Sequence, residues 1–314
     1  MSEPANLHQE KSTTVRKVHA YPKQRSTPIT YLARTTLRTT GRIVSALSPA
    51  IAGRLAAPMF LTPPRPKRPA WEDERLATAR PWRLTLANGR SVAAWRWLGD
   101  GPTVVLVHGW GGRGSQLSAM AAPLVEAGFS VVAFDAPGHG DSDGRRSSLV
   151  AMSSALHAVA AASAPLAGVV AHSAGATATA MVLANGLDIP RIVFVGPGVE
   201  PVTFTHAFAD HLGLSEPARR SMQERIERHV GIRLDEIDPL ALAPDFDIPL
   251  LTFHDHEDRE TPFDGAQRLT AAWPDAELRP TRGLGHRRIL RDNTVVAQTV
   301  RFFARASRSR RPAA

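Results

Sequence analysis

The chain has 314 residues, of which 43% are hydrophobic and none is cysteine, so it can bury the core of one large domain but can form neither a disulfide nor a catalytic thiolate. Its formal net charge of +9 is concentrated at the two ends: residues 1–70 carry +10, residues 301–314 carry +5, and residues 71–300 sum to −6. Because the central region is mildly acidic, we predict no nucleic-acid partner.

The first 28 residues are polar and basic and show no hydrophobic periodicity, which predicts a disordered tail. They lack the apolar core of a signal peptide, so we expect a cytoplasmic protein. An Arg-, Ser- and Thr-rich start that is poor in acidic residues is also similar to an organellar transit peptide, and that alternative stays open.

Residues 29–70 are predicted to form an amphipathic helical arm followed by a proline-rich linker. Apolar residues recur at nearly helical spacing from Ile29 to Leu61, with arginines among them and a break near Pro49. The arginines leave no apolar run long enough to span a bilayer. The arm either packs on the main domain, which is the commoner arrangement, or lies on a membrane surface as a peripheral contact with its arginines at the headgroups.

Short apolar runs alternate with helical segments through most of the remaining chain. Strands are expected at 82–86, 91–97, 103–107, 130–134, 167–171, 191–195, 249–253 and 276–279, and helices at 116–127, 149–162, 174–185, 263–273 and 289–303. The first two strands flank Asn88-Gly89, a sequence typical of a β-hairpin turn. This order predicts an α/β domain with a mostly parallel central sheet, helices on both faces and an antiparallel edge.

The alternation is interrupted between about residues 198 and 244, where helical segments but no convincing strand are found, including the charged run 216–229. We expect a helical cap over the carboxyl ends of the strands, where ligands bind in such sheets. The main domain is predicted to span 71–306, and residues 307–314 to form a basic tail.

Ser173 lies where a buried strand is predicted to pass directly into a small-residue helix. So sharp a bend exposes the serine beside the free N–H groups of the new helix, and it requires small neighbours such as Ala171 and Gly175. The motif is close to Gly-x-Ser-x-Gly, with Ala in place of the first Gly. Taken alone, an ordinary helix that begins with a capping serine would look the same.

The segment 108–112, His-Gly-Trp-Gly-Gly, follows the strand at 103–107. Glycines let backbone N–H groups approach a ligand closely, so the N–H groups of Trp110 and Ala174 are the expected oxyanion donors. Gly109, Trp110 and His172 are expected to contact the substrate. A glycine-rich connection without a ligand is the alternative. The Pro- and Gly-containing turn at 135–142 is expected to be scaffold.

The segment 254–262 follows another strand and begins His-Asp-His-Glu-Asp. His-x-His-x-Asp also opens a zinc motif, but that motif would continue with His where this chain has Arg259, so we expect no metal and no cofactor. His286 follows Gly-Leu-Gly after the last strand and has the freedom to reach a neighbouring serine. Ser173, an acid in 254–262 and His286 therefore occur in the order serine, acid, histidine.

From Trp82 to Phe303 the chain resembles the α/β-hydrolase fold superfamily. The resemblance is carried by motifs that each follow a predicted strand: 108–112, 135–142, 172–175, 254–262 and 283–286. It implies Ser173 as nucleophile and His286 as general base. It also implies Asp258 rather than Asp255 as the acid, because the acid commonly lies four residues after the first histidine of this loop. Glu200 is the reserve acid.

The resemblance implies a serine hydrolase that cleaves carboxylic esters through an acyl-enzyme on Ser173. A serine at this position argues against the haloalkane dehalogenase and epoxide hydrolase branches, which use aspartate there. The short cap and the bulky Trp110 favour small-molecule esters with small or medium acyl groups. A thioesterase, a lipase or an acyltransferase would use the same triad, and a non-catalytic binding protein is the alternative outside enzymes. The sequence does not indicate whether the protein forms oligomers.

Overall fold

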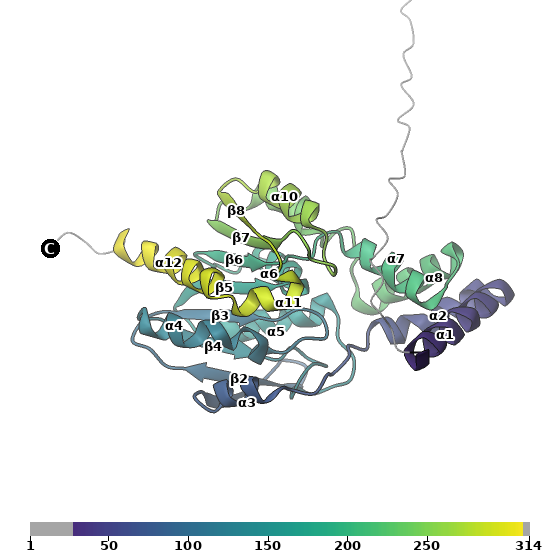
Figure 1. The fold of residues 1–314 in the computed structure, drawn as a ribbon, viewed down its shortest axis with the longest axis horizontal. Helices are drawn as coiled ribbons and strands as arrows, with labels where there is room; N and C mark the ends of the chain where they lie inside the picture. The colour runs from purple at the N-terminus through teal and green to yellow at the C-terminus, as the bar shows by residue number, and fades with distance from the viewer. Residues whose placement is uncertain (1–27, 310–314) are drawn as a thin grey trace, which may run out of the picture.

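The computed structural model describes residues 28–309, so the tail predicted for residues 1–28 lies outside the described residues except for Pro28. A single eight-stranded sheet forms the centre, in the order β1-β2-β4-β3-β5-β6-β7-β8 (Figure 1). The strands are β1 Arg80–Thr85, β2 Ser91–Trp97, β3 Thr103–Val107, β4 Ser130–Phe134, β5 Leu166–His172, β6 Ile192–Val195, β7 Leu250–Asp255 and β8 Ala276–Thr281. At one edge of the sheet, β2 pairs antiparallel with both β1 and β4. All the other neighbouring strands in this order pair in parallel, as predicted.

Helices cover both faces of the sheet. One face carries α3 (Ala70–Leu76), η1 (Gly114–Met120), α4 (Ala121–Glu126) and α12 (Asn293–Ser309), and the other carries α5 (Leu149–Ala161), α6 (Ala174–Ala184) and α10 (Phe263–Ala272). In β3, Val104 and Leu106 pack toward the first group and Val105 toward the second. All positions of β3 are buried because successive side chains point to opposite, covered faces.

Three local predictions differ from the structure. The helix expected at 116–127 is the 3₁₀ helix η1 followed by α4, and the helix expected at 289–303 is divided into α11 (Gly285–Arg288), η3 (Ile289–Arg291) and α12. Asp292 separates η3 from α12, because its carboxylate accepts the first free N–H groups of α12 at Thr294 and Val295. α12 continues to Ser309, so the basic tail expected from residue 307 starts inside a helix. α3 is not predicted from the sequence, because its seven residues are too few to show a helical period.

The N-terminal arm comprises α1 (Pro28–Leu47) and α2 (Pro49–Phe60), which are separated at Ser48 close to the predicted break. The cap comprises α7 (Pro201–Leu212), α8 (Glu216–Val230), α9 (Pro239–Leu242) and the 3₁₀ helix η2 (Ala243–Asp245). Figure 1 shows the arm beside α7 and α8, at one end of the sheet. Between Pro28 and Ser309, every helix is too short or too polar to cross a membrane.

One face of the arm packs on the cap, as the first of the two alternatives predicted. Ala52, Gly53, Ala56 and Ala57 of α2 are buried. At Gly53 the helices are so close that a Cβ atom would lie 2.7 Å from the backbone nitrogen of Met222 in α8. The small residues of α2 therefore allow close contact between the two backbones.

Candidate active site

Ser173 joins β5 to α6 in a backbone conformation that is rare for a residue with a side chain, with φ 52° and ψ −121°. Its surroundings leave little room: a Cβ atom at Gly109 would lie 2.7 Å from Ser173 Cβ, and one at Gly175 would lie 2.8 Å from the His108 carbonyl oxygen. The strain and the close packing are what a nucleophile elbow requires, since they project the serine beyond the edge of the sheet.

His286, in α11 after β8, and Asp258, on the loop after β7, form a buried pair. His286 Nδ1 lies 2.7 Å from Asp258 Oδ2. Asp258 Oδ1 accepts the backbone N–H groups of Glu260 and Thr261, and Thr261 Oγ1 donates to Oδ2 at 3.0 Å. Burial alone would raise the pKa of the Asp258 carboxyl, but hydrogen bonds from His254 and His286 outweigh burial and hold this pKa well below its usual range. The carboxylate is thus anionic and fixed in orientation.

The His286 ring lies next to the strand that carries Ser173. Its centroid is 4.4 Å from the ring of His172, and His172 Nε2 donates to the His286 carbonyl oxygen at 2.9 Å. Burial and the neighbouring His286 hold the pKa of His172 well below its ordinary value, so the His172 ring is neutral. His172, expected to contact the substrate, is 4% exposed and packs against His286.

The other candidate acids have different partners. Asp255 Oδ2 accepts Thr281 Oγ1 and the backbone N–H of Leu284, and so ties β7 to the loop before His286. The reserve acid Glu200 forms an ion pair of 2.5 Å with Arg268. Within residues 28–309, Asp258 is the carboxylate that hydrogen-bonds to His286 Nδ1.

Two further polar residues of the 254–262 loop, His254 and Glu260, lie near the Asp258–His286 pair, whereas His256 does not. His254 Nε2 lies 3.0 Å from the Thr261 carbonyl oxygen and 3.4 Å from Asp258 Oδ2, while His256 packs on Phe263 with ring centroids 3.9 Å apart. Glu260 Oε2 lies 3.9 Å from His286 Nε2, on the side of the ring opposite to Asp258. Of the residues that resembled a zinc motif, His254 and Asp258 thus lie together, whereas His256 contacts Phe263.

The expected oxyanion donors Trp110 and Ala174 lie together with Ser173 in the lining of one cavity. Behind them, His108 Nδ1 donates to the Gly109 carbonyl oxygen at 2.7 Å and His108 Nε2 accepts the Ala136 N–H at 2.8 Å. Burial, with the nearby His139, lowers the pKa of His108 to about 3, so a neutral ring links the two loops.

Two buried carboxylates hold the loop that carries Trp110. Asp135 accepts the N–H groups of Gly114 and Asp141, each at 2.7 Å, in agreement with the scaffold role predicted for segment 135–142. Burial raises the pKa of Asp135 to about 6, although both hydrogen bonds act in the opposite direction. Glu72 of α3 forms a doubly hydrogen-bonded pair with Arg113 at 2.6 and 2.9 Å. No local sequence pattern predicts this pair, since its members are far apart in the chain.

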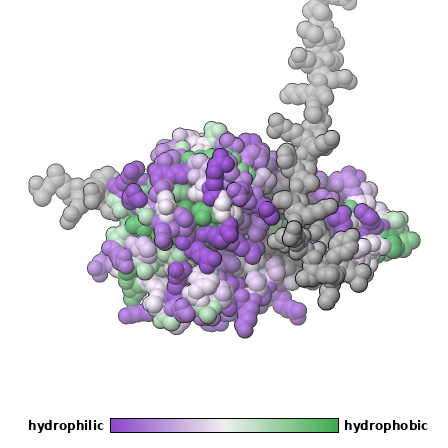
Figure 2. All heavy atoms as spheres, in the orientation of Figure 1, coloured by the Kyte–Doolittle hydropathy of each residue, from purple (hydrophilic) through white to green (hydrophobic). Residues whose placement is uncertain are grey.

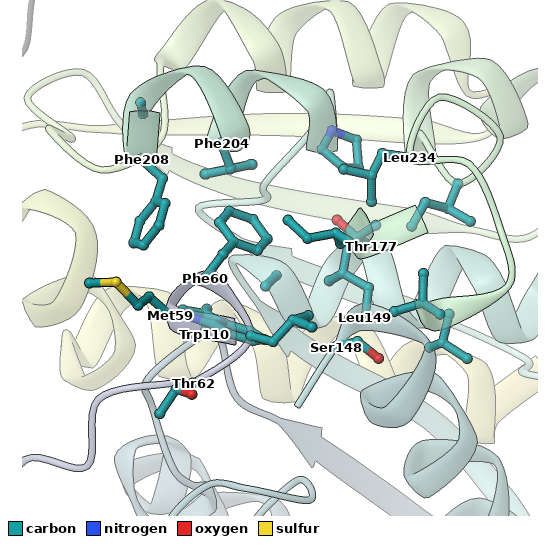
Figure 3. A pocket seen from close by; sticks show the side chains of 18 of the residues that line it. Met59, Phe60, Thr62, Trp110, Ser148, Leu149, Thr177, Phe204, Phe208 and Leu234 are labelled. Carbon is teal, nitrogen blue, oxygen red and sulfur yellow. The ribbon is translucent and has the colours of Figure 1, made fainter. Parts of the chain in front are cut away.

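The cavity has a volume of about 480 Å³, within the usual range of ligand pockets. Most of its lining is apolar, and it comes from the arm, the 108–112 loop, α5, α6 and the cap. Figure 3 shows Phe60, Phe208 and Trp110 along one side, with Leu149 and Leu234 across from them. Phe60 stacks on Trp110 at 6.4 Å and meets Phe208 edge to face at 5.3 Å. The contribution of the arm to this cavity is not predictable from the sequence pattern, which indicates helices but not what they contact.

Comparisons with known proteins agree with this architecture. Residues 102–228 match the model of the alpha/beta hydrolase fold family. The structure is similar to the esterase Pf2001 of Pyrococcus furiosus, with 21% identity over 78% of this chain and 97% of that chain and a TM-score of 0.59. It is also similar to a putative lipase of Acinetobacter baumannii, with 16% identity over 77% and 97% and a TM-score of 0.59.

A third similar structure is a bacterial membrane phospholipase A, with 18% identity over 89% of this chain and 99% of that chain and a TM-score of 0.57. Among curated proteins, none matches the sequence. The sheet order, the family match and these structural likenesses together show the α/β-hydrolase fold, with an esterase and a putative lipase among the similar structures, which confirms the predicted fold class.

Proposed function

We propose that the protein is a serine hydrolase that cleaves carboxylic esters through an acyl-enzyme on Ser173. The observation that carries the proposal is the 2.7 Å contact between Asp258 and His286, beside a strained serine that opens into an apolar cavity. A buried carboxylate that fixes the tautomer of a histidine is the arrangement that makes that histidine a base for a neighbouring serine.

In the proposed reaction His286 Nε2 accepts the proton of Ser173 as Oγ attacks the ester carbonyl carbon. The N–H groups of Trp110 and Ala174 stabilise the oxyanion, each by about 3 kcal/mol. The bond to the alkoxy oxygen then breaks, and the alcohol leaves with the proton from His286. Water, deprotonated by the same histidine, attacks the acyl-enzyme and releases the carboxylic acid and free Ser173.

The lining of the cavity supports an apolar acyl group as the bound part of the substrate. The similar structures include an esterase, a putative lipase and a phospholipase A, and all three names denote hydrolysis of carboxylic esters. A small or medium acyl group remains our prediction. Thioesterase and acyltransferase activities use the same residues and differ in the leaving group or the acceptor, so they are the alternatives within this mechanism.

Labelling by a fluorophosphonate probe tests the mechanism. The unmodified protein should be labelled, and Ser173→Ala and His286→Ala should each abolish labelling. Ser154→Ala, on the exposed face of α5, is the matched control and should label normally. No labelling of the folded, unmodified protein would overturn the proposal and favour a non-catalytic binding protein. Hydrolysis of p-nitrophenyl esters of increasing chain length, compared with thioesters and with added alcohol acceptors, then separates the alternatives.

A further inference from the structure

Large apolar side chains are exposed almost exclusively on the arm. Among residues 35–305, whose side chains the structure describes, seven such side chains are exposed, and six of them belong to α1 and α2. Five of these recur at every fourth residue, and we call them the apolar stripe: Ile43, Leu47, Ile51, Leu55 and Met59. Leu47 is the most exposed, at 81%. A cluster of exposed apolar side chains of this kind marks a surface that binds another molecule or a membrane.

The stripe lies on the side of the arm that does not contact the cap. In α2 the buried small residues face α8, and the stripe residues alternate with them along the helix. Figure 2 shows hydrophobic surface at the tip of the molecule, where Figure 1 places α1 and α2. The packing of the arm on the cap therefore leaves the apolar stripe facing outward.

The stripe ends at the cavity that contains Ser173. Met59 is 46% exposed and also lines this cavity, so it lies at the opening. The next residue, Phe60, stacks on Trp110 inside. A continuous apolar path thus runs from the tip of the arm to the proposed oxyanion donor.

The charge of the arm is entirely positive. The sequence contains no Asp or Glu from Lys11 to Trp71. Arg42 and Arg54 are exposed, and each directly precedes a residue of the stripe. Apolar side chains with arginines beside them are typical of a helix that lies in the plane of a membrane, where the guanidinium groups reach the anionic headgroups.

We propose that the arm docks on an anionic lipid surface through the apolar stripe, and that the ester substrate enters the cavity from that surface. The second part rests on the proposed hydrolase function, whereas the first does not. A second copy of the chain fits the arm less well. A symmetric contact would place arginines opposite arginines without an acidic partner in the arm, which disfavours association.

The test is flotation of the full chain with vesicles, with Ser173→Ala included so that binding is measured without turnover. Vesicles of phosphatidylcholine and phosphatidylglycerol should bind the protein, and vesicles of phosphatidylcholine alone should bind it roughly tenfold more weakly. The triple variant Leu47→Ser, Ile51→Ser, Leu55→Ser should lose binding by roughly tenfold or more. Leu98→Ser, at the seventh exposed apolar residue, is the matched control and should bind normally.

Activity on two substrates separates this inference from the proposed function. The triple variant should hydrolyse a soluble p-nitrophenyl ester at the unmodified rate but lose activity on an ester embedded in the anionic vesicles. Equal vesicle binding by the triple variant and the unmodified protein would overturn the docking. The docking would also be overturned if the triple variant differed from the unmodified protein only in its oligomeric state, measured by light scattering. The stripe would then be a contact between copies. Vesicle binding without ester hydrolysis would retain the docking and reject the hydrolase.

Discussion

Replacing Asp258 by asparagine tests the central geometric claim, because the two oxygens of this carboxylate have different partners. Oδ1 accepts the backbone N–H groups of Glu260 and Thr261, and an asparagine carbonyl oxygen can keep both bonds. Oδ2 faces His286 Nδ1 at 2.7 Å, and there asparagine would present an NH₂ group. The amide needs an acceptor, so the His286 proton moves from Nδ1 to Nε2. Nε2 then cannot accept the proton of Ser173.

The expected loss in kcat is about 10⁴-fold, the size found where a triad histidine is held in the wrong tautomer. This corresponds to about 5 kcal/mol of transition-state stabilisation. The assay is steady-state hydrolysis of p-nitrophenyl butyrate, with the melting temperature measured in parallel to show that the fold persists. Asp264→Asn, exposed on α10, is the matched control and should keep the unmodified rate. A larger loss from Asp255→Asn than from Asp258→Asn would refute the assignment of the acid.

Three further changes test other parts of the site. Glu72→Ala leaves a buried guanidinium unpaired and should lower the free energy of unfolding by about 3–5 kcal/mol. The exposed Glu74→Ala should cost at most about 0.5 kcal/mol in the same urea titration, and equal losses would contradict the buried pair. Gly109→Ala adds a methyl group 2.7 Å from Ser173 Cβ, so kcat should fall about a hundredfold. An unchanged kcat would show that the 108–112 loop moves to make room for the methyl group. Burial lowers the pKa of His139 from 6.5 to about 4. Since the unfolded ring takes up a proton below pH 6.5 and the folded ring does not, stability should fall by up to about 3 kcal/mol from pH 6.5 to 4. His139→Asn should reduce the slope of stability against pH by about 1.4 kcal/mol per pH unit. An unchanged slope would contradict the lowered pKa of His139.

Local sequence patterns are enough to predict the α/β architecture and the places where chemistry could occur. The Val-rich run at 103–107 has the length and bounds of β3, because a strand buried on both faces is continuously apolar and ends where glycines begin. The bend at Ser173 was also predictable, since a strand that runs directly into a small-residue helix leaves one residue at the corner. These features are local, so the chemical character of a few adjacent residues is sufficient to specify them.

Which distant residues meet depends instead on how the elements pack in three dimensions. Asp255 and Asp258 are three residues apart and chemically alike, and the path of the loop alone directs one to Thr281 and the other to His286. Likewise, the periodicity of the arm predicted helices, but not that Phe60 of α2 would line the cavity or that Leu47 of α1 would stay exposed. Such contacts join elements that are remote in the chain, and packing of their surfaces, which no local pattern encodes, fixes the distances between them.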